Sequence, residues 1–328
     1  MLEKFNRLSE RLKSKILFNH EMGHLTWFKT GGKAKVFIIV ENENELEILI
    51  NNLDGYNYFI MGVGSNLLIR DKGYNGAIIK LGKGFNELKI EEGFIQVGSS
   101  ILDINLSKFA KNNSIKNFEF FSGIPGTIGG AVKMNSGCFG FETKDILKKI
   151  KFIDIKGNKY EINADKLDLK YRSSNLKDTD IVTSAKFRIT YGEIQLIKDK
   201  INLIKLEREK KQPLKERTSG STFKNPPNHF AAELIDKAGC RGLEIGDAAV
   251  SLKHANFLIN KGRATAGEIE QLGKIIIDKV FDKFDILGPH MVQVPGPDGE
   301  RGFGGKCLPK DIRAFSTVYN SKLLNEID

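Results

Sequence analysis

SGIPGTIGGAVKMNSGCFG, residues 122–140, places six glycines among 19 residues and carries a single charged side chain. Glycine tolerates positive φ angles and lets backbone N–H groups come close to an anion, which is how proteins commonly cradle a diphosphate. The GxGxxG spacing of a dinucleotide-binding fingerprint is missing, because the segment reads GIPGTIGGA. Taken alone, the stretch fits either a diphosphate site or a tight structural loop.

A second loop favours the diphosphate interpretation. The segment MGVGSNLLIRD, residues 61–71, follows an apolar strand and groups two glycines with Ser65 and Asn66. Side chains of these two types donate to phosphate oxygens or cap local turns. Together with the Thr-Gly-Gly turn at residues 30–32, the two loops predict one distributed diphosphate site.

The periodicity of the chain predicts an α+β fold in several units. An amphipathic helix over residues 1–18, two strands joined by a turn over 26–40 and a helix over 41–53 begin the first unit. Short strands dominate residues 85–191, and the glycine-rich stretch lies in their middle. A charged helix over 193–212 then leads to a further unit of helix, strand and helix.

The composition is that of a globular protein, with 328 residues, 40% hydrophobic and 28% charged. No apolar run approaches the eighteen or so residues that span a bilayer, so we expect no membrane association. The net charge of +10 is interspersed with acids, which argues against a nucleic-acid partner and equally suits a ligand with several phosphates. Three widely separated cysteines and five histidines show no metal-ligand spacing, and a reducing cytoplasm is the expected compartment.

Five segments in a fixed order resemble the UDP-N-acetylenolpyruvoylglucosamine reductases (the MurB family), flavoenzymes of peptidoglycan precursor synthesis. These segments are MGVGSNLLIRD (61–71), IPGTIGGAVKMNSGCFG (124–140), YRSSNL (171–176), GSTFKNP (220–226) and AAELIDKAGCRGLEIGDAAVSLKHANFLIN (231–260). The resemblance runs over about residues 20–287, and the ordered set is far more specific than any one motif.

The resemblance implies an α+β architecture: a two-lobed FAD-binding fold of the PCMH and MurB type, followed by a C-terminal α/β substrate-binding domain. The predicted boundaries are residues 1–82 for the first lobe, 83–212 for the second lobe, 213–287 for the substrate-binding domain and 288–328 for an atypical tail. The positions that match flavin-holding residues of the family are Thr30, Gly31, Gly32, Gly62, Gly64, Ser65, Asn66, Leu67, Ile124, Pro125, Gly126, Gly129, Gly130 and Asn135.

Two residues match the catalytic positions of the family. Arg172 corresponds to an arginine whose planar cation faces the enolpyruvyl carboxylate and the enolate that grows on it. Ser221 corresponds to the proton donor, which needs a position close to the substrate carbon and a relay that restores its proton. Alone, each residue is equally typical of a surface ion pair or a turn.

The resemblance also implies substrate-binding residues. Lys224 and Asn225 match positions that bind the UDP part, and Arg208 is a further phosphate partner. His254 and Asn256 in SLKHANF complete the set, although His254 is equally typical of a buried histidine that bonds to the backbone.

The implied activity is reduction of UDP-N-acetylglucosamine enolpyruvate to UDP-N-acetylmuramate, with FAD as cofactor and NADPH as hydride donor, in a monomer. Another flavin-dependent oxidase of the same fold, or a catalytically weak UDP-sugar-binding flavoprotein, is the alternative. Oxygen consumption without the enolpyruvyl substrate would favour the oxidase.

The end of the chain departs from the family pattern. Family members carry a catalytic glutamate on a final strand, whereas here GPHMVQ follows FDKFDIL at residues 281–287. The segment 288–315 instead resembles the catalytic-cysteine region of UDP-sugar 6-dehydrogenases, with Cys307 and Lys310 at matching positions. We therefore expect a foreign tail and impaired turnover, since loss of one electrostatic stabiliser commonly lowers a rate about 10²- to 10³-fold.

Overall fold

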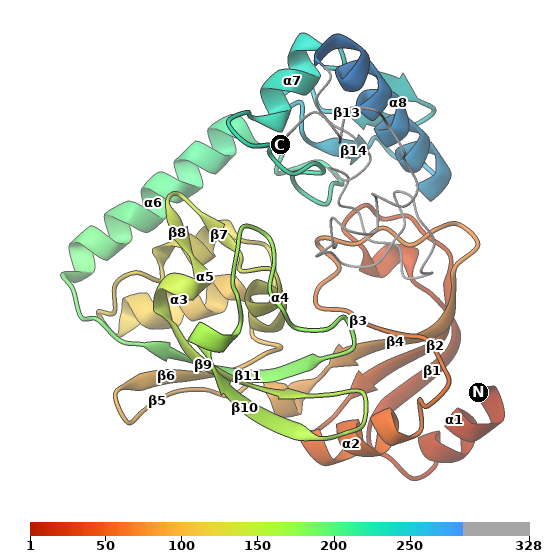
Figure 1. Ribbon diagram of the computed structural model, residues 1–328, viewed down its shortest axis with the longest axis vertical. Helices are drawn as coiled ribbons and strands as arrows, with labels where there is room; N and C mark the ends of the chain where they lie inside the picture. Colours follow the sequence, from red (N-terminus) through yellow and green to blue (C-terminus); the bar gives the residue numbers. More distant parts are fainter. Residues whose placement is uncertain (285–328) are drawn as a thin grey trace, which may run out of the picture.

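The computed structural model describes residues 1–284 of the chain. Within them the protein is built in three parts, two lobes based on β-sheets and a smaller C-terminal part, each with a hydrophobic core. Figure 1 shows the C-terminal part above the two lobes, with a long helix running along one side toward it. The α+β fold class predicted from the sequence is confirmed.

The first lobe is a four-stranded sheet. In spatial order its strands are β1 (Lys15–Glu21), β2 (Lys33–Val40), β4 (Tyr74–Leu81) and β3 (Tyr58–Ile60). Only β1 is antiparallel to its neighbour. Successive side chains of a strand face opposite sides of a sheet, so Ile38 of β2 packs with helices α1 (Leu2–Ser9) and α2 (Glu43–Asn51), while Phe37 packs with the loop that carries Met61. This second face positions the first glycine loop.

The start of the chain differs from the prediction. Helix α1 ends at Ser9 and β1 begins at Lys15, where the sequence predicts one helix through residue 18. Pairing with β2 overrides the helical spacing of apolar residues. The first strand predicted within residues 26–40 is also wrong, because residues 26–30 form turns, in which Thr26 Oγ1 donates to the carbonyls of Gly23 and Thr30.

The second lobe is a five-stranded antiparallel sheet. In spatial order its strands are β10 (Lys159–Asn163), β9 (Leu147–Ile153), β11 (Ile181–Arg188), β6 (Phe94–Gly98) and β5 (Leu88–Glu91). Helices α3 (Asp103–Asn112) and α4 (Ile128–Lys133) join its core. Phe187 of β11 meets Phe118 and Phe121 edge-on in this core, with ring centroids 5.8 Å apart in both pairs.

The glycine-rich stretch folds into a compact series of short elements. The short elements of the two lobes are α5 (Thr143–Ile146), β7 (Gly137–Cys138), β8 (Phe141–Glu142) and the 3₁₀ helices Gly23–Leu25, Lys83–Phe85, Glu119–Gly123 and Ala164–Lys166. Residues 124–127 connect the 3₁₀ helix Glu119–Gly123 to α4, and together with the first turn of α4 they form the second glycine loop, residues 124–130.

Helix α6 (Ile194–Lys211) leads from the second lobe to the C-terminal part, as Figure 1 shows. The C-terminal part contains α7 (Ala231–Lys237), β12 (Glu244–Ile245), β13 (Ala248–Val250), β14 (Leu258–Asn260) and α8 (Ala266–Phe284). Its core also includes Phe28 and Leu68 of the first lobe, both with no exposed surface. The third part is therefore packed on the first lobe.

Polar contacts also stabilise the interface between the first lobe and the C-terminal part. Asp71 of the first lobe accepts hydrogen bonds from the backbone N–H groups of Ala266 and Gly267, both at 2.9 Å, and so caps helix α8 from another part of the molecule. Arg70 Nε lies 2.8 Å from Glu270 Oε1 in a half-buried ion pair. These contacts hold the first glycine loop, which ends at Asp71, in a fixed relation to α8.

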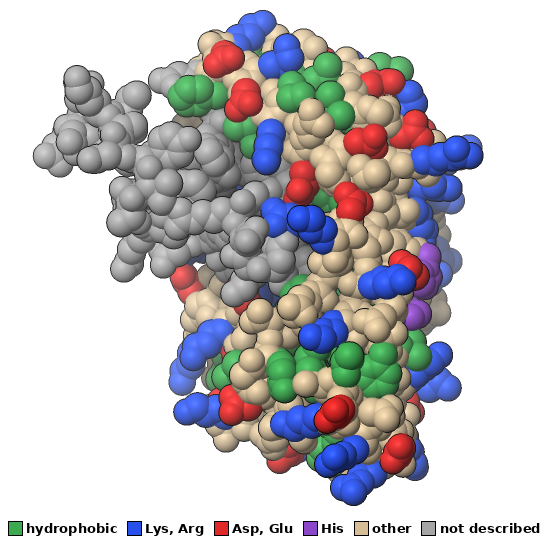
Figure 2. Space-filling model, turned by 90° about the vertical axis from the view of Figure 1, so that its right-hand side faces the viewer, with side chains coloured by type: hydrophobic (Ala, Val, Ile, Leu, Met, Phe, Trp, Pro, Cys, Tyr) green, Lys and Arg blue, Asp and Glu red, His purple; other side chains and the backbone are tan. Residues whose placement is uncertain are grey.

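Charged side chains are mixed over the surface in Figure 2, where Lys and Arg alternate with Asp and Glu. Along residues 1–284, no helix combines the length and apolar character that crossing a membrane would require.

Candidate active site

All three parts line one cavity of about 580 Å³. Most of the residues that the sequence predicts to hold the flavin lie in its wall. They are Gly62, Gly64, Ser65, Asn66, Leu67, Ile124, Pro125, Gly126, Gly129, Gly130 and Asn135. The cavity thus brings together two loops that lie about sixty residues apart in the sequence.

Steric contacts explain the glycines of the first loop. Gly64 has a φ of +68°, and a Cβ there would lie 2.4 Å from the carbonyl oxygen of Leu25. Its own carbonyl accepts a hydrogen bond from the N–H of Trp27 at 3.0 Å. A Cβ at Gly62 would lie 2.8 Å from Thr127 Oγ1. The two loops therefore meet without room for a side chain between them.

The second loop is anchored to the turn between β6 and α3. Gly129 N–H donates to the carbonyl of Ser99 at 2.9 Å, and Ile128 N–H donates to the carbonyl of Ile101 at 3.0 Å. Asn135 is buried with φ +42°, and its Oδ1 accepts a hydrogen bond from Lys144 N–H at 2.9 Å. This asparagine braces the loop from within the protein while it also lines the cavity.

The turn at residues 30–32 lies outside the cavity wall. A Cβ at Gly31 would lie 2.7 Å from the carbonyl oxygen of Ile69, and one at Gly32 would lie 2.3 Å from that of Asp71. Gly32 N–H donates to the carbonyl of Arg70 at 3.0 Å. In this structure Thr30, Gly31 and Gly32 pack against the end of the first glycine loop, and direct contact with a flavin stays a prediction.

The two predicted catalytic residues face the cavity together. Arg172 lies in a tight turn in which Lys170 and Ser173 exchange backbone hydrogen bonds of 3.1 and 3.0 Å. Its φ is +50°, an uncommon value for a residue with a side chain and one that clusters at functional sites. Arg172 Nη1 lies 3.4 Å from the carbonyl oxygen of Ser221, which also lines the cavity. The turn therefore brings the guanidinium to the serine.

Two arginine side chains in the cavity wall are not neutralised by carboxylates of the described residues. Across residues 1–284, neither Arg172 nor Arg208 forms an ion pair with an acid, and Arg208 Nε donates to Gln212 Oε1 at 3.0 Å. Burial lowers the pKa of Arg208. Lys224 lies outside the wall, and its pKa is lowered first by burial and then by the charge of Arg172. Uncompensated arginines in a half-buried cavity suit carboxylate and phosphate ligands.

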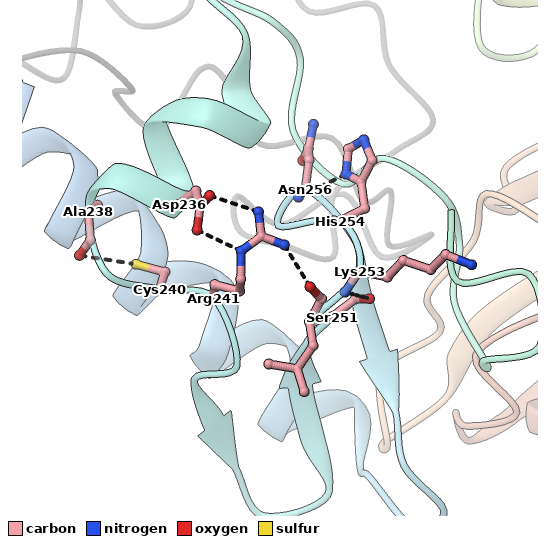
Figure 3. A network of polar contacts seen from close by, with 9 residues as sticks. Asp236, Ala238, Cys240, Arg241, Ser251, Lys253, His254 and Asn256 are labelled. Atoms are coloured by element: carbon pink, nitrogen blue, oxygen red, sulfur yellow. Dashed lines mark hydrogen bonds and ion pairs between the residues drawn. The ribbon is translucent and has the colours of Figure 1, made fainter. Parts of the chain in front are cut away.

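The remaining predicted substrate residues bond within the protein. Asn225 Oδ1 accepts from Ala231 N–H at 3.0 Å at the start of α7. Asn256 forms two hydrogen bonds with the backbone of Phe223, at 2.8 and 2.9 Å. His254 Nδ1 accepts from Asn256 N–H at 3.2 Å, as Figure 3 shows, and burial lowers its pKa. Asn256 thus holds the segment directly after Ser221.

A second cluster in Figure 3 supports the loop that carries His254. Arg241 binds Asp236 through two bonds of 2.7 Å and donates to the carbonyl of Leu252 at 2.7 Å. The fork of the guanidinium fixes the start of this loop relative to α7. The loop that holds Asn256 is therefore braced at both ends.

Comparison with known proteins places the chain in a family. The family model described as the C-terminal domain of UDP-N-acetylenolpyruvoylglucosamine reductase matches residues 212–288, and an FAD binding domain model matches residues 34–163. UDP-N-acetylenolpyruvoylglucosamine reductase of Rickettsia bellii (strain RML369-C) is 45% identical over 266 residues, which are 80% of this chain and 88% of that protein. The chain belongs to the UDP-N-acetylenolpyruvoylglucosamine reductase family.

Further relatives agree with this assignment to the MurB family. The protein of the same name from Rickettsia typhi (strain ATCC VR-144 / Wilmington) is 44% identical over 272 residues, 83% of this chain and 92% of that one. The crystal structure of UDP-N-acetylenolpyruvylglucosamine reductase (MurB) from Thermus caldophilus superposes with a TM-score of 0.73 and 30% identity, covering 81% of this chain and 95% of that chain. The resemblance seen in the sequence and the MurB-like FAD-binding fold are confirmed.

Sequence reasoning missed two polar residues of the MurB-type cavity. Asp103 and Ser99 line it, and both are buried. Neither side chain has a hydrogen-bond partner within the described residues. In the sequence Asp103 looks like an ordinary acidic residue in the first turn of a helix, so only its burial identifies it.

The atypical tail, with Cys307, Lys310 and the position of the family's catalytic glutamate, lies outside the described residues. The predicted foreign origin and the predicted impairment therefore stay predictions.

Proposed function

We propose that this protein reduces UDP-N-acetylglucosamine enolpyruvate to UDP-N-acetylmuramate, with FAD as its cofactor and NADPH as the hydride donor. The observation that carries the proposal is the cavity itself. It unites both glycine loops with Arg172 and Ser221 in a chain 45% identical to a named reductase.

The residues present fit FAD. Both glycine loops line the cavity, and their close packing at Gly62 and Gly64 leaves backbone rather than side chains at these positions of its wall. Buried polar atoms that have no partner among residues 1–284, Ser99 Oγ and both carboxyl oxygens of Asp103, lie in the same wall. A bound flavin would supply two-electron chemistry, taking hydride from NADPH and passing it to the enolpyruvyl group. The backbone N–H groups of both loops are suited to hold its diphosphate.

Arg172 and Ser221 divide the remaining chemistry. The guanidinium carries a permanent charge, and one N–H bond to the Ser221 carbonyl leaves other donors free for the substrate carboxylate. As hydride adds to one carbon, negative charge grows on the carboxylate side, and a fixed cation stabilises that charge. The Ser221 hydroxyl would deliver the proton to the neighbouring carbon.

Phosphate recognition is assigned to the cations near this pair. Arg208 faces the cavity from α6, and Lys224 lies close enough to Arg172 for their charges to interact. A dianionic diphosphate between such cations would relieve their mutual repulsion. Asn225, His254 and Asn256 support this region through their bonds within the chain.

The direct test is an assay of NADPH oxidation with and without UDP-N-acetylglucosamine enolpyruvate. We expect a yellow protein with flavin absorbance, and oxidation that depends on the enolpyruvyl substrate. A colourless protein that refuses added FAD would contradict the proposal. Oxidation that consumes oxygen equally well without that substrate would support a flavin oxidase instead.

The setting of the reaction is part of the proposal. We infer a cytoplasmic monomer, because NADPH is an intracellular reductant and Cys138 and Cys240 are free thiols. Comparing the rate of a single turnover with the steady-state rate would also test whether the tail slows catalysis.

A further inference from the structure

Asp103 is a buried carboxylic acid in the wall of the cavity. It belongs to the first turn of α3 and has no exposed surface. Neither of its carboxyl oxygens has a hydrogen-bond partner within residues 1–284, and it forms no ion pair there. A buried polar group without a partner destabilises a fold, so its presence in a cavity points to a ligand.

The surroundings of Asp103 direct its carboxyl group to the second glycine loop. Asp103 N–H donates to the carbonyl of Gly126 at 3.1 Å, and a Cβ at Gly126 would lie 2.6 Å from Asp103 Oδ2. Ser99 Oγ, also buried and unpartnered within the described residues, lies in the same wall. Because Gly126 has no side chain, the second glycine loop can lie directly against the buried carboxyl group.

The electrostatics favour the neutral acid. Burial raises the pKa of Asp103 well above its usual range. The nearby thiol of Cys138 is itself held neutral, since burial raises its pKa to about 12, and it donates to the carbonyl of Phe120 at 3.2 Å. A neutral carboxyl group both donates and accepts hydrogen bonds, whereas a carboxylate only accepts.

We propose that Asp103, together with Ser99, binds the flavin nucleotide through hydrogen bonds to an uncharged polar group. This inference rests on the proposed function and adds a cofactor-binding residue that no motif of the chain indicates. A group that offers both donors and acceptors matches a neutral acid. On the flavin half of FAD, two parts have that chemistry, the pyrimidine edge of the isoalloxazine ring and the ribityl hydroxyls.

The test compares FAD binding and stability in the full-length protein after its flavin has been removed. Asp103→Leu is similar in size but has no polar atom. We expect it to weaken FAD binding about tenfold or more, the equivalent of one or two lost hydrogen bonds. The flavin-free variant should melt at the same temperature as the wild type or higher, since an unpartnered buried acid has been removed.

Weaker FAD binding together with an unchanged or higher melting temperature would show that Asp103 binds the cofactor and does not stabilise the fold. Asp103→Asn keeps a neutral donor and acceptor and should bind FAD within about threefold of the wild type. Ser107→Ala is the matched control, because Ser107 lies one turn further along α3, buried and unpartnered within the described residues, but outside the cavity wall. It should leave FAD binding unchanged.

The absorption spectrum of the bound flavin distinguishes the two candidate partners. A shift in Asp103→Asn would assign the contact to the isoalloxazine ring, and weaker binding of Asp103→Leu without a shift in either variant would assign it to a part of the cofactor outside the ring, such as the ribityl chain.

Three results would overturn the inference: unchanged FAD affinity in Asp103→Leu, a lower melting temperature of its flavin-free form, or failure of both Asp103→Leu and Asp103→Ala to fold. A wild-type protein that binds no FAD would instead refute the proposed function.

Discussion

Arg172 and Ser221 meet through the backbone. The guanidinium contacts the backbone carbonyl oxygen of Ser221 at 3.4 Å, and the serine hydroxyl takes no part in that contact. The positive φ of Arg172 orients this side chain from a two-residue turn. Motif spacing could suggest both residues, but their separation by 49 positions in the sequence hides the fact that they are neighbours.

Ser221→Ala should separate the two halves of the reaction. Because the hydroxyl is proposed to deliver a proton only to the enolpyruvyl carbon, its loss should slow substrate reduction about 10²- to 10⁴-fold. Reduction of the flavin by NADPH should keep its normal rate. Stopped-flow absorbance of each half-reaction measures both rates, and equal slowing of the two would contradict the assigned role.

At the scale of single elements, the glycine loops were predictable and their supports were not. Residues 61–67 of the first loop line one cavity with residues 124–127, Gly129 and Gly130 of the second, as the sequence suggests. Gly31 and Gly32 pack against the end of the first loop, and this contact between separate segments of the chain leaves no local pattern in the sequence. The same reason explains the error at residues 15–18, where a helical spacing of apolar residues yields to strand pairing with β2.

Gly64→Ala tests the first loop against a matched control. Gly64 and Gly55 both have positive φ angles, +68° and +75°, but only Gly64 has backbone within 3 Å of a Cβ position. Gly55→Ala should lower the free energy of unfolding by about 1 kcal/mol. Gly64→Ala should lower it by more and should weaken FAD binding, as denaturant unfolding and flavin titration would show. Equal effects of the two changes would contradict the steric explanation.

Helix α2 is held to the segment before β1 by a carboxylate. Glu45 accepts hydrogen bonds from the N–H groups of Lys13 and Ser14 and from the Ser14 hydroxyl, at 3.1, 2.7 and 2.6 Å. Burial alone would raise the pKa of Glu45, but the bonds from Ser14, Lys13 and Asn42 outweigh it, and the pKa is lowered. The ionised form is therefore the one that the fold stabilises.

Glu45→Gln should consequently show a pH-dependent loss of stability. A carboxyl group whose pKa is lowered by folding stabilises the protein above its unfolded pKa, near 4.5, and this contribution disappears as the pH falls through the folded value. At pH 7 we expect a loss of about 2 kcal/mol. Denaturant unfolding from pH 7 to pH 3 should bring the two proteins together, and a constant gap would disprove the assignment.

At the scale of the whole molecule, the C-terminal part depends on the first lobe. The cap of α8 comes from Asp71, almost two hundred residues earlier in the chain. Sequence patterns predicted the two helices of this part, α7 and α8. The single strand predicted between them is wrong, because the structure has three short strands there, β12, β13 and β14. Sequence patterns could not predict a cap donated from another part.

Asp71→Ala should loosen this attachment. Two backbone N–H groups at the start of α8 would lose their acceptor, which commonly lowers the free energy of unfolding by about 1–2 kcal/mol. Asp278→Ala is the control, because Asp278 lies on the exposed side of α8 and its carboxylate accepts no hydrogen bond from residues 1–284. Hydrogen exchange of the first turn of α8 should rise only in Asp71→Ala. Unchanged protection there would mean that the helix start does not need Asp71.

The mixed core around Phe28 and Leu68 limits how this protein can be recombined with its relatives. Both side chains belong to the FAD-binding lobe, yet they fill space among residues of α7, α8 and β14. A chimera that exchanges only the segment from residue 213 onward would leave these two positions facing a foreign surface. Residues of the two parts that share this core must therefore change together during evolution. A transplanted C-terminal segment should need the residues that its own parent protein carries at the positions of Phe28 and Leu68.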